Sequence, residues 1–301
     1  MPSQPSSSYR GRLAPSPTGL LHLGHARTFL TAHARTRSAN GTLVLRNEDF
    51  DQQRSRPEFY KAIIEDLRWL GINWDEGPDI GGPFAPYSQS RRRASYLIAF
   101  NQLRNAGFLY PCTCSRKDLA LAASAPHEGG PAQFDGDDPI YPGTCRPQAQ
   151  SQAQPSSSLN HLQNLPPSHS AANWRFRVSD GEVIAFHDQH YGLQQFVAGR
   201  DFGDFLVWRR DGVPSYQLAC VADDAAMRIT EVVRGADLLK SAARQLLLYR
   251  ALKLEPPAWY HCPLVTDSAG QRLAKRHDAL SIRTLRAQGR TPQDLAQPAL
   301  C

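Results

Sequence analysis

The sequence has no long apolar run. No window of the 301 residues approaches 18 uninterrupted apolar residues, which excludes an ordinary transmembrane helix. The polar residues 1–8 also lack the apolar core of a secretory signal peptide. We therefore expect a cytoplasmic protein with no membrane partner.

Cysteine is scarce as well. Six cysteines in 301 residues are too few for a disulfide framework. A composition of 41% hydrophobic and 21% charged residues excludes a disordered, collagen-like or coiled-coil chain. The formal net charge of +6 is compatible with a polyanionic partner without requiring one.

The apolar pattern predicts an α/β fold. A short strand over 10–15 leads into a turn, and apolar positions then recur at helical spacing over 26–34. A second strand covers 42–46, and Pro57 opens a helix that Gly71 ends. Strand–helix–strand–helix is typical of a parallel sheet with crossover helices.

The middle of the chain interrupts this pattern. A helix is expected near 92–105, after which residues 124–172 are rich in Pro, Ser and Gln and predict a mobile segment. Two short strands at 174–178 and 183–186 are expected to pair antiparallel. The strand–helix alternation then resumes with strands at 205–208 and 228–233 and helices at 216–222 and 240–253.

We therefore predict a Rossmann-like doubly wound parallel sheet that is split by a smaller insertion. The expected parts are a disordered N-terminus (1–9), a first half of the catalytic domain (10–108), the insertion (109–203) and a second half with a short tail (204–301).

A glycine-containing turn, PSPTGLLHLGH over 15–25, lies between the first strand and helix. Such a turn places free backbone N–H groups and the positive helix end together, which makes an anion site. His22 and His25 flank the turn and can donate hydrogen bonds to phosphate oxygens. The alternative is two ordinary surface histidines beside a loop.

A basic run, RLAKR over 272–276, follows a polar stretch near the end of the chain. Lys275 there could reach a triphosphate as a point charge. Taken alone, the run is equally consistent with a solvated surface.

Three cysteines are grouped as Cys112-x-Cys114 and, 31 residues further on, Cys145. In a reducing compartment this grouping favours a metal over a disulfide. Three thiolates leave room for a fourth ligand, and His127 lies within the insertion. The alternative is a metal-free loop with buried thiols.

The histidine turn and the lysine run resemble the HIGH and KMSKS motifs of class I aminoacyl-tRNA synthetases. The glutamyl branch is more similar still, through RLAPSPTGLLHLGHARTFL, LVLRNEDFDQQRS, YQLACVADD and ITEVVRGADLL in the family's order. The resemblance covers roughly residues 10–285 outside the insertion. Within that branch the chain is similar to the glutamyl-queuosine tRNA(Asp) synthetases, truncated paralogues without an anticodon-binding domain.

This resemblance implies a two-step ligase reaction. Glutamate attacks the α-phosphorus of ATP and expels pyrophosphate, and the glutamyl-adenylate then reacts with a hydroxyl of the queuosine base at the wobble position of tRNA(Asp). His22, Gly24, His25 and Lys275 are the implied ATP-binding residues, and both histidines and the lysine are the implied catalytic groups. A Mg²⁺ ion would bridge the phosphates.

The resemblance also implies a glutamate site and a zinc site. An arginine suits the side-chain carboxylate of glutamate, Glu48 pairs with its α-ammonium, and Tyr216 contributes a hydroxyl contact. The implied glutamate site comprises Arg12, Leu13, Ala14, Pro15, Ser16, Glu48, Tyr216 and Arg234. The implied zinc ligands are Cys112, Cys114, Tyr141 and Cys145, and four protein ligands make this zinc structural.

The chain departs from the family pattern in two places. The loop that usually reads Lys-x-Ser-Lys has Arg272 and Ala274 before the retained Lys275, and the spans 117–139 and 147–172 look inserted. Three alternatives stay open. Arg12 and Arg234 could form salt bridges with Glu48 or Glu231. The chain could be a glutamate–tRNA ligase that charges the 3′ adenosine, or a zinc-containing RNA-binding module with a decayed active site. A monomer is the expected state.

Overall fold

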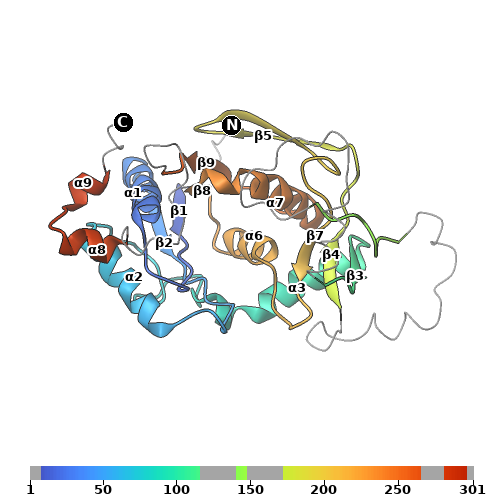
Figure 1. Ribbon diagram of the computed structural model, residues 1–301, viewed down its shortest axis with the longest axis horizontal. Coiled ribbons are helices and arrows are strands. Elements are labelled where there is room, and N and C mark those ends of the chain that lie inside the picture. Colours follow the sequence, from blue (N-terminus) through green and yellow to red (C-terminus); the bar gives the residue numbers. More distant parts are fainter. Residues whose placement is uncertain (1–7, 116–139, 148–171, 266–280, 297–301) are drawn as a thin grey trace, which may run out of the picture.

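The computed structural model describes residues 8–115, 140–147, 172–265 and 281–296. Parallel strands form its centre (Figure 1). The longer parallel pairs are β1 (Arg10–Leu13) with β2 (Thr42–Leu45) and β8 (Glu231–Gly235) with β9 (Ala258–Cys262). Asp188 also pairs in parallel with Trp259 of β9. The N–H of Thr230 donates to the Arg10 carbonyl at 2.9 Å, so β1 lies between β2 and β8 although 220 residues separate it from Thr230.

Helices cover both faces of these strands. Successive side chains of a strand point to opposite faces, so neighbouring residues of one strand pack into different cores. Leu43, Leu45 and Val233 belong to one apolar core, whereas Val44 and Val232 belong to another. The first core includes α1 (Leu23–Ser38) and α2 (Pro57–Trp69), and the second α3 (Arg93–Asn105), α6 (Tyr216–Ala226) and α7 (Leu239–Leu252). The predicted α/β class with a parallel sheet is confirmed.

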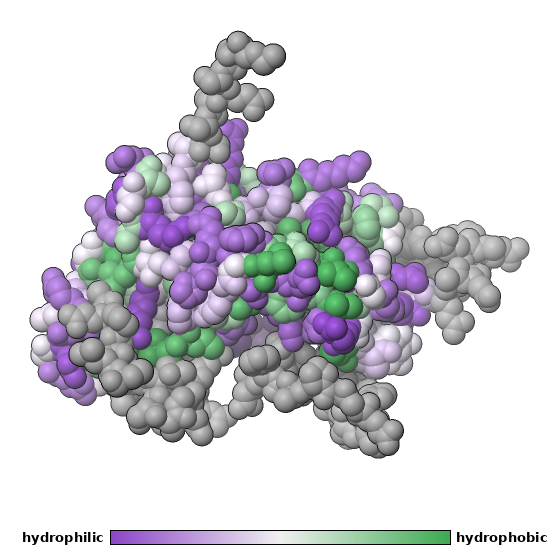
Figure 2. All heavy atoms as spheres, turned by 90° about the horizontal axis from the view of Figure 1, so that it is seen from above, coloured by the Kyte–Doolittle hydropathy of each residue, from purple (hydrophilic) through white to green (hydrophobic). Residues whose placement is uncertain are grey.

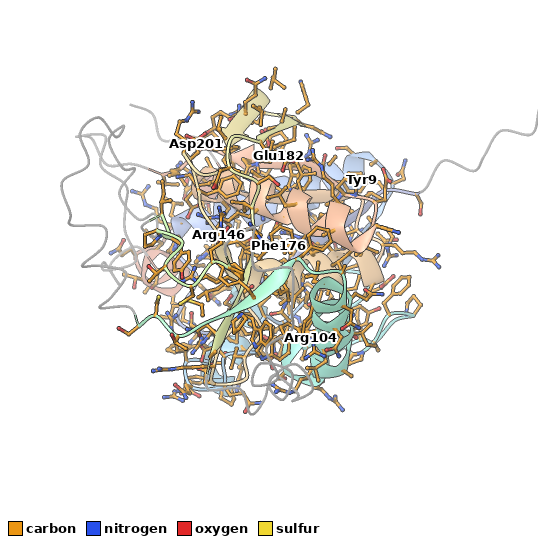
Figure 3. All side chains as sticks on the ribbon, turned by 90° about the vertical axis from the view of Figure 1, so that its right-hand side faces the viewer. Tyr9, Arg104, Arg146, Phe176, Glu182 and Asp201 are labelled. Atoms are coloured by element: carbon orange, nitrogen blue, oxygen red, sulfur yellow. The ribbon has the colours of Figure 1, made fainter. Side chains whose placement is uncertain are left out.

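A separate antiparallel sheet lies at the opposite end of the molecule from α1 and α2 (Figure 1). Its order is β3 (Leu109–Cys112), β4 (Asn173–Phe176) and β7 (Phe205–Trp208). Figure 3 looks onto this end, with Phe176 of β4 and Arg146 labelled. The Phe176 ring stacks between two others, with its centre 5.5 Å from the centre of the Phe108 ring and 5.2 Å from that of Phe205.

Two strand predictions were wrong in their partners. The strands expected to pair at 174–178 and 183–186 lie in different sheets, because β5 (Val183–Asp188) pairs with β6 (Gly192–Val197) instead. The segment 192–197 reads GLQQFV, and the adjacent Gln194 and Gln195 break the apolar–polar alternation that indicates a strand. The strand near 205 also joins the antiparallel sheet and not the parallel one.

Short helices α8 (Ile282–Ala287) and α9 (Pro292–Ala296) lie at the end of the molecule that also holds α1 and α2 (Figure 1). Among the described residues, none of the helices combines the length and apolar character needed to cross a membrane. The face in Figure 2 is mostly hydrophilic, with small hydrophobic groups between the polar side chains.

Candidate functional site

The histidine turn begins α1. His22 is the residue before the helix, and its Nδ1 accepts a hydrogen bond from the N–H of Gly24 at 3.1 Å. Its own backbone N–H donates to Nδ1 of His25 at 3.3 Å, and the two rings lie 3.7 Å apart between their centres. A Cβ at Gly24 would lie 3.1 Å from the His22 ring, a tight contact that the ring would have to relieve by a small shift. The imidazoles and the helix N-terminus thus form one polar group, as an anion site needs.

Lys275, Arg272 and Ala274 lie outside the described residues, as does His127. The two described flanks of the range 266–280 both lie at the histidine turn. Ser281 forms a β-bridge with His22, and the N–H of Ile282 donates to the Leu21 carbonyl at 2.8 Å. On the other side, a Cβ built at Gly24 would lie 3.9 Å from the Val265 side chain. The chain therefore leaves this turn before residue 266 and is back beside it at residue 281.

The ends of the parallel strands bring distant polar side chains to one face of the sheet. Arg12 precedes Leu13 in β1, and Glu48 follows β2 at a position two residues beyond Arg46. Arg234 lies on β8 two residues after Val232. All four are at most 5% exposed, and they share the face that α6 and α7 cover.

Arg46 is the centre of this group. It is fully buried and makes ion pairs with Asp224 at 2.5 Å and with Glu48 at 3.0 Å, while Asp223 lies 3.8 Å away. Burial alone would lower the pKa of Arg46, but the three carboxylates raise it, so the guanidinium stays charged. Burial raises the pKa of Glu48, an effect that Arg46 and Arg12 oppose.

Our sequence reading did not single out Arg46 or the two aspartates. The sequence does contain a signal for Arg46. Val44, Arg46 and Glu48 are spaced two residues apart and so share one face of the extended chain, and a charged side chain on a buried face needs a partner. That partner lies 178 residues further along the chain, on α6.

The two candidate arginines are held mostly by uncharged acceptors. Nη1 of Arg12 donates to the Val233 carbonyl at 2.8 Å, and its Nε lies 3.7 Å from Asp224 without a hydrogen bond. Arg234 donates from Nε to His261 and from Nη1 to Gln245, and its buried Nη2 has no hydrogen-bond partner among the described residues. Two buried guanidinium nitrogens are therefore left without an acceptor.

The salt bridges considered from the sequence do not form among the described residues. Glu231 instead pairs with Arg35 at 2.7 Å and accepts a hydrogen bond from Tyr9. Glu48 pairs with Arg46.

Tyr216, the first residue of α6, lies within this group. Burial raises its pKa, Glu48 adds to the rise, and Arg234 and Arg12 counteract it. The strand-to-turn segment Leu13–Ser16 runs alongside, since the Pro15 carbonyl accepts the N–H of Glu48 at 3.1 Å. The structure thus brings together the predicted glutamate-site residues from both halves of the chain.

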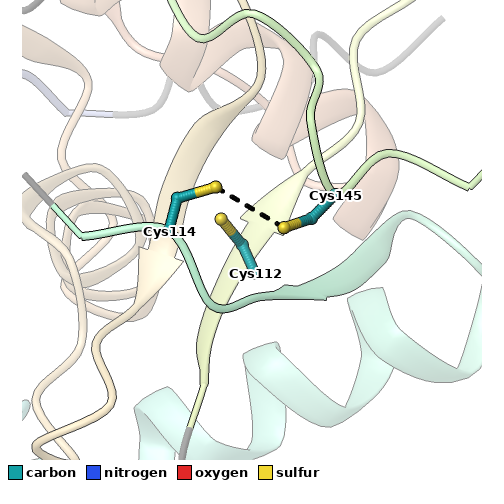
Figure 4. Close-up of side chains that lie close together, drawn as sticks. All are labelled: Cys112, Cys114 and Cys145. Atoms are coloured by element: carbon teal, nitrogen blue, oxygen red, sulfur yellow. Dashed lines mark hydrogen bonds between the residues drawn. The ribbon is translucent and has the colours of Figure 1, made fainter. Parts of the chain in front are cut away.

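The three predicted cysteine ligands form a cluster at the end of β3 (Figure 4). The sulfurs of Cys112, Cys114 and Cys145 all lie within 4.8 Å of one another. The Tyr141 hydroxyl lies 3.4 Å from the Cys112 sulfur and 3.7 Å from that of Cys114. Burial would raise the pKa of Cys145, but hydrogen bonds from Thr113 and Tyr141 outweigh it and lower the pKa to about 6. This donor set suits a tetrahedral ion such as Zn²⁺.

Arg175, which the sequence reading did not single out, lies against this cluster. Its Nε donates to the Cys112 sulfur at 3.3 Å, and its guanidinium lies 3.8 Å from the centre of the Tyr141 ring. A buried cation in this position offsets the negative charge of thiolates. Asp204 fixes the segments on either side of this cluster, because its carboxylate accepts a hydrogen bond from Nε of Arg146 at 2.8 Å and another from the Tyr110 hydroxyl.

Comparisons with known proteins identify the family of the chain. A family model for the catalytic domain of class I tRNA synthetases (E and Q) matches residues 8–298. The chain is 49% identical over 280 residues to the glutamyl-Q tRNA(Asp) synthetase of Nitratidesulfovibrio vulgaris, covering 93% of this chain and 82% of that protein.

Longer proteins are also similar. The chain is 42% identical over 281 residues to glutamate–tRNA ligase 2 of Acidithiobacillus ferrooxidans but spans only 55% of its length. It superposes with a TM-score of 0.74 and 31% identity on a glutamate–tRNA synthetase from Elizabethkingia anophelis, covering 90% of this chain and 53% of that one.

Proposed function

Because this chain belongs to the class I tRNA synthetases of the glutamate and glutamine branch, we propose that it activates glutamate with ATP and transfers it to the queuosine base at the wobble position of tRNA(Asp). Ligase activity follows from family membership. The choice of queuosine as acceptor is supported by the name of the relative at 49% identity, which exceeds the 42% identity to a glutamate–tRNA ligase.

The observation that carries the proposal is the convergence at the start of α1. His22 and His25 lie there, and both described flanks of the range with Lys275 return to the same turn. A nucleoside triphosphate bound at this turn would meet two imidazoles and a helix N-terminus, and Lys275 would neutralise charge at the phosphoryl group. Mg²⁺ would accompany ATP as part of the substrate.

The buried polar group beside the turn is proposed to hold glutamate. Nη2 of Arg234 and Nε of Arg12, which have no hydrogen-bond partner in the described part of the chain, are donors for a carboxylate, and Glu48 is an acceptor for the α-ammonium. Tyr216 and the segment Leu13–Ser16 would line the same space. An unpaired buried donor is costly, so a ligand that supplies its acceptor gains binding energy there.

Zinc is proposed to be structural. Cys112, Cys114, Cys145 and Tyr141 would hold it and leave no position open for catalysis. The ion would cross-link β3 to the segment around Cys145 and so stabilise the insertion that we propose for residues 109–203.

Two assays test the proposal. Glutamate-dependent ATP–pyrophosphate exchange reports the first step, and its absence would support the decayed RNA-binding module instead. Transfer of labelled glutamate is then compared between tRNA(Asp) with and without queuosine. We expect product only on the modified tRNA.

The matches to glutamate–tRNA ligases make charging of the 3′ adenosine the second candidate function. Queuosine-containing tRNA(Asp) lacking its terminal adenosine separates the two. Product on this trimmed tRNA supports transfer to the base, whereas product only on intact tRNA regardless of queuosine supports the second candidate.

A further inference from the structure

We propose that His261 and Asp188 are positioning residues for glutamate binding, because they form a buried chain of hydrogen bonds that ends at Arg234. This inference rests on the proposed function, in which Arg234 binds a carboxylate of glutamate. Neither His261 nor Asp188 was singled out from the sequence.

Sheet register places the three side chains together. Arg234 of β8 and His261 of β9 are direct cross-strand partners, so their side chains project from the same face. Asp188, the last residue of β5, pairs in register with Trp259, two residues before His261. His261 and Asp188 are fully buried and Arg234 is 4% exposed.

The hydrogen bonds to Asp188 and Arg234 favour one arrangement of protons on His261. Oδ2 of Asp188 lies 2.6 Å from Nδ1 of His261 and accepts the backbone N–H of the same residue at 3.1 Å. Its Oδ1 accepts the N–H groups of His190 and Tyr191 at 3.0 and 2.8 Å. Four such contacts favour the ionised carboxylate, so Nδ1 of His261 carries the hydrogen and donates it.

The other ring nitrogen then serves Arg234. Nε of Arg234 donates to Nε2 of His261 at 3.0 Å, which requires a lone pair on Nε2 and a neutral imidazole. Burial and the neighbouring Arg234 agree with this, since they lower the pKa of His261 to about 4. The second anchor is Gln245, whose Oε1 accepts from Nη1 at 2.9 Å.

Two anchored nitrogens fix the plane of the guanidinium. Nη2 is the nitrogen with no partner among the described residues, and the chain from Asp188 through His261 determines where it points. A fixed guanidinium binds a carboxylate without first losing side-chain freedom, so its affinity is higher. His261 therefore acts on glutamate through Arg234 and does not touch it.

The test compares KM values in glutamate-dependent ATP–pyrophosphate exchange. His261→Leu removes both hydrogen bonds, and we expect KM for glutamate to rise roughly 10- to 100-fold, the range for losing a hydrogen bond to a charged group. KM for ATP should stay within about twofold, because the loss is confined to glutamate binding. His261→Gln keeps an acceptor for Arg234 and should recover part of the affinity. His187→Leu, an exposed position on β5, is the matched control and should change neither value.

Asp188→Asn provides a second route if His261→Leu does not fold. It keeps the shape but removes the charge that fixes the Nδ1–H form of His261, so KM for glutamate should rise here too. Equal rises for glutamate and ATP, or an unchanged KM for glutamate in all three variants, would overturn the inference. Absence of glutamate-dependent exchange in the unmodified protein would overturn the proposed function as well.

Discussion

Replacing Arg46 with methionine tests whether the buried charge group is a structural necessity. The change removes the only guanidinium within ion-pair distance of Glu48 among the described residues. Asp224 and Asp223 keep weaker or separate partners, Arg12 at 3.7 Å and Arg92 at 2.6 Å. Removing one member of a buried ion pair costs roughly 3–5 kcal/mol, and these remaining cations favour the lower end of that range.

Urea unfolding measures this cost. With a denaturant slope of roughly 3 kcal/mol per molar, a loss of about 3 kcal/mol lowers the midpoint by about 1 M. Arg68→Met is the matched control, because Arg68 is 64% exposed and lies 3.3 Å from Asp79. Such an exposed pair contributes about 0–1 kcal/mol. If Arg46→Met costs no more than Arg68→Met, the reasoning from burial fails.

Three further outcomes are expected. Lys275→Ala should reduce ATP–pyrophosphate exchange while leaving the urea midpoint unchanged, and an unaltered exchange rate would count against its role. Cys114→Ser should lower the zinc content measured by metal analysis, whereas Cys262→Ser, outside the cluster, should retain it. Burial raises the pKa of Asp66 from 3.8 to about 6, so the folded state favours its protonated form. The stability of the unmodified protein relative to Asp66→Asn should therefore fall by on the order of 2 kcal/mol as pH rises from 4 to 6, and parallel unfolding-versus-pH curves would contradict this.

The helices were predictable because their signals are local. Pro57 and Gly71 bracket a periodic apolar pattern, and α2 runs from Pro57 to Trp69. The sheet partners were not predictable in the same way. Pro111 argues against a strand in the sequence, although β3 tolerates it as an edge strand. The adjacent Gln194 and Gln195 interrupt the apolar alternation expected of β6.

The candidate site likewise contains residues with local sequence signals and residues without them. The turn with His22 and His25 is a contiguous motif, and resemblance supplied Arg12, Glu48, Tyr216 and Arg234. Arg46 and His261 escaped notice because their meaning depends on partners 178 and 73 residues away. Only the folded sheet makes such residues neighbours.

The position of β1 beside β8 has a consequence for synthesis. About 220 residues must be added after β1 before Thr230 can bond to it. At about 5–20 residues per second, the first strand pair therefore waits about 10–40 s on the ribosome with one edge open. The open edge of the nascent N-terminal half is available for mispairing throughout that interval. This half therefore completes its folding only late in synthesis.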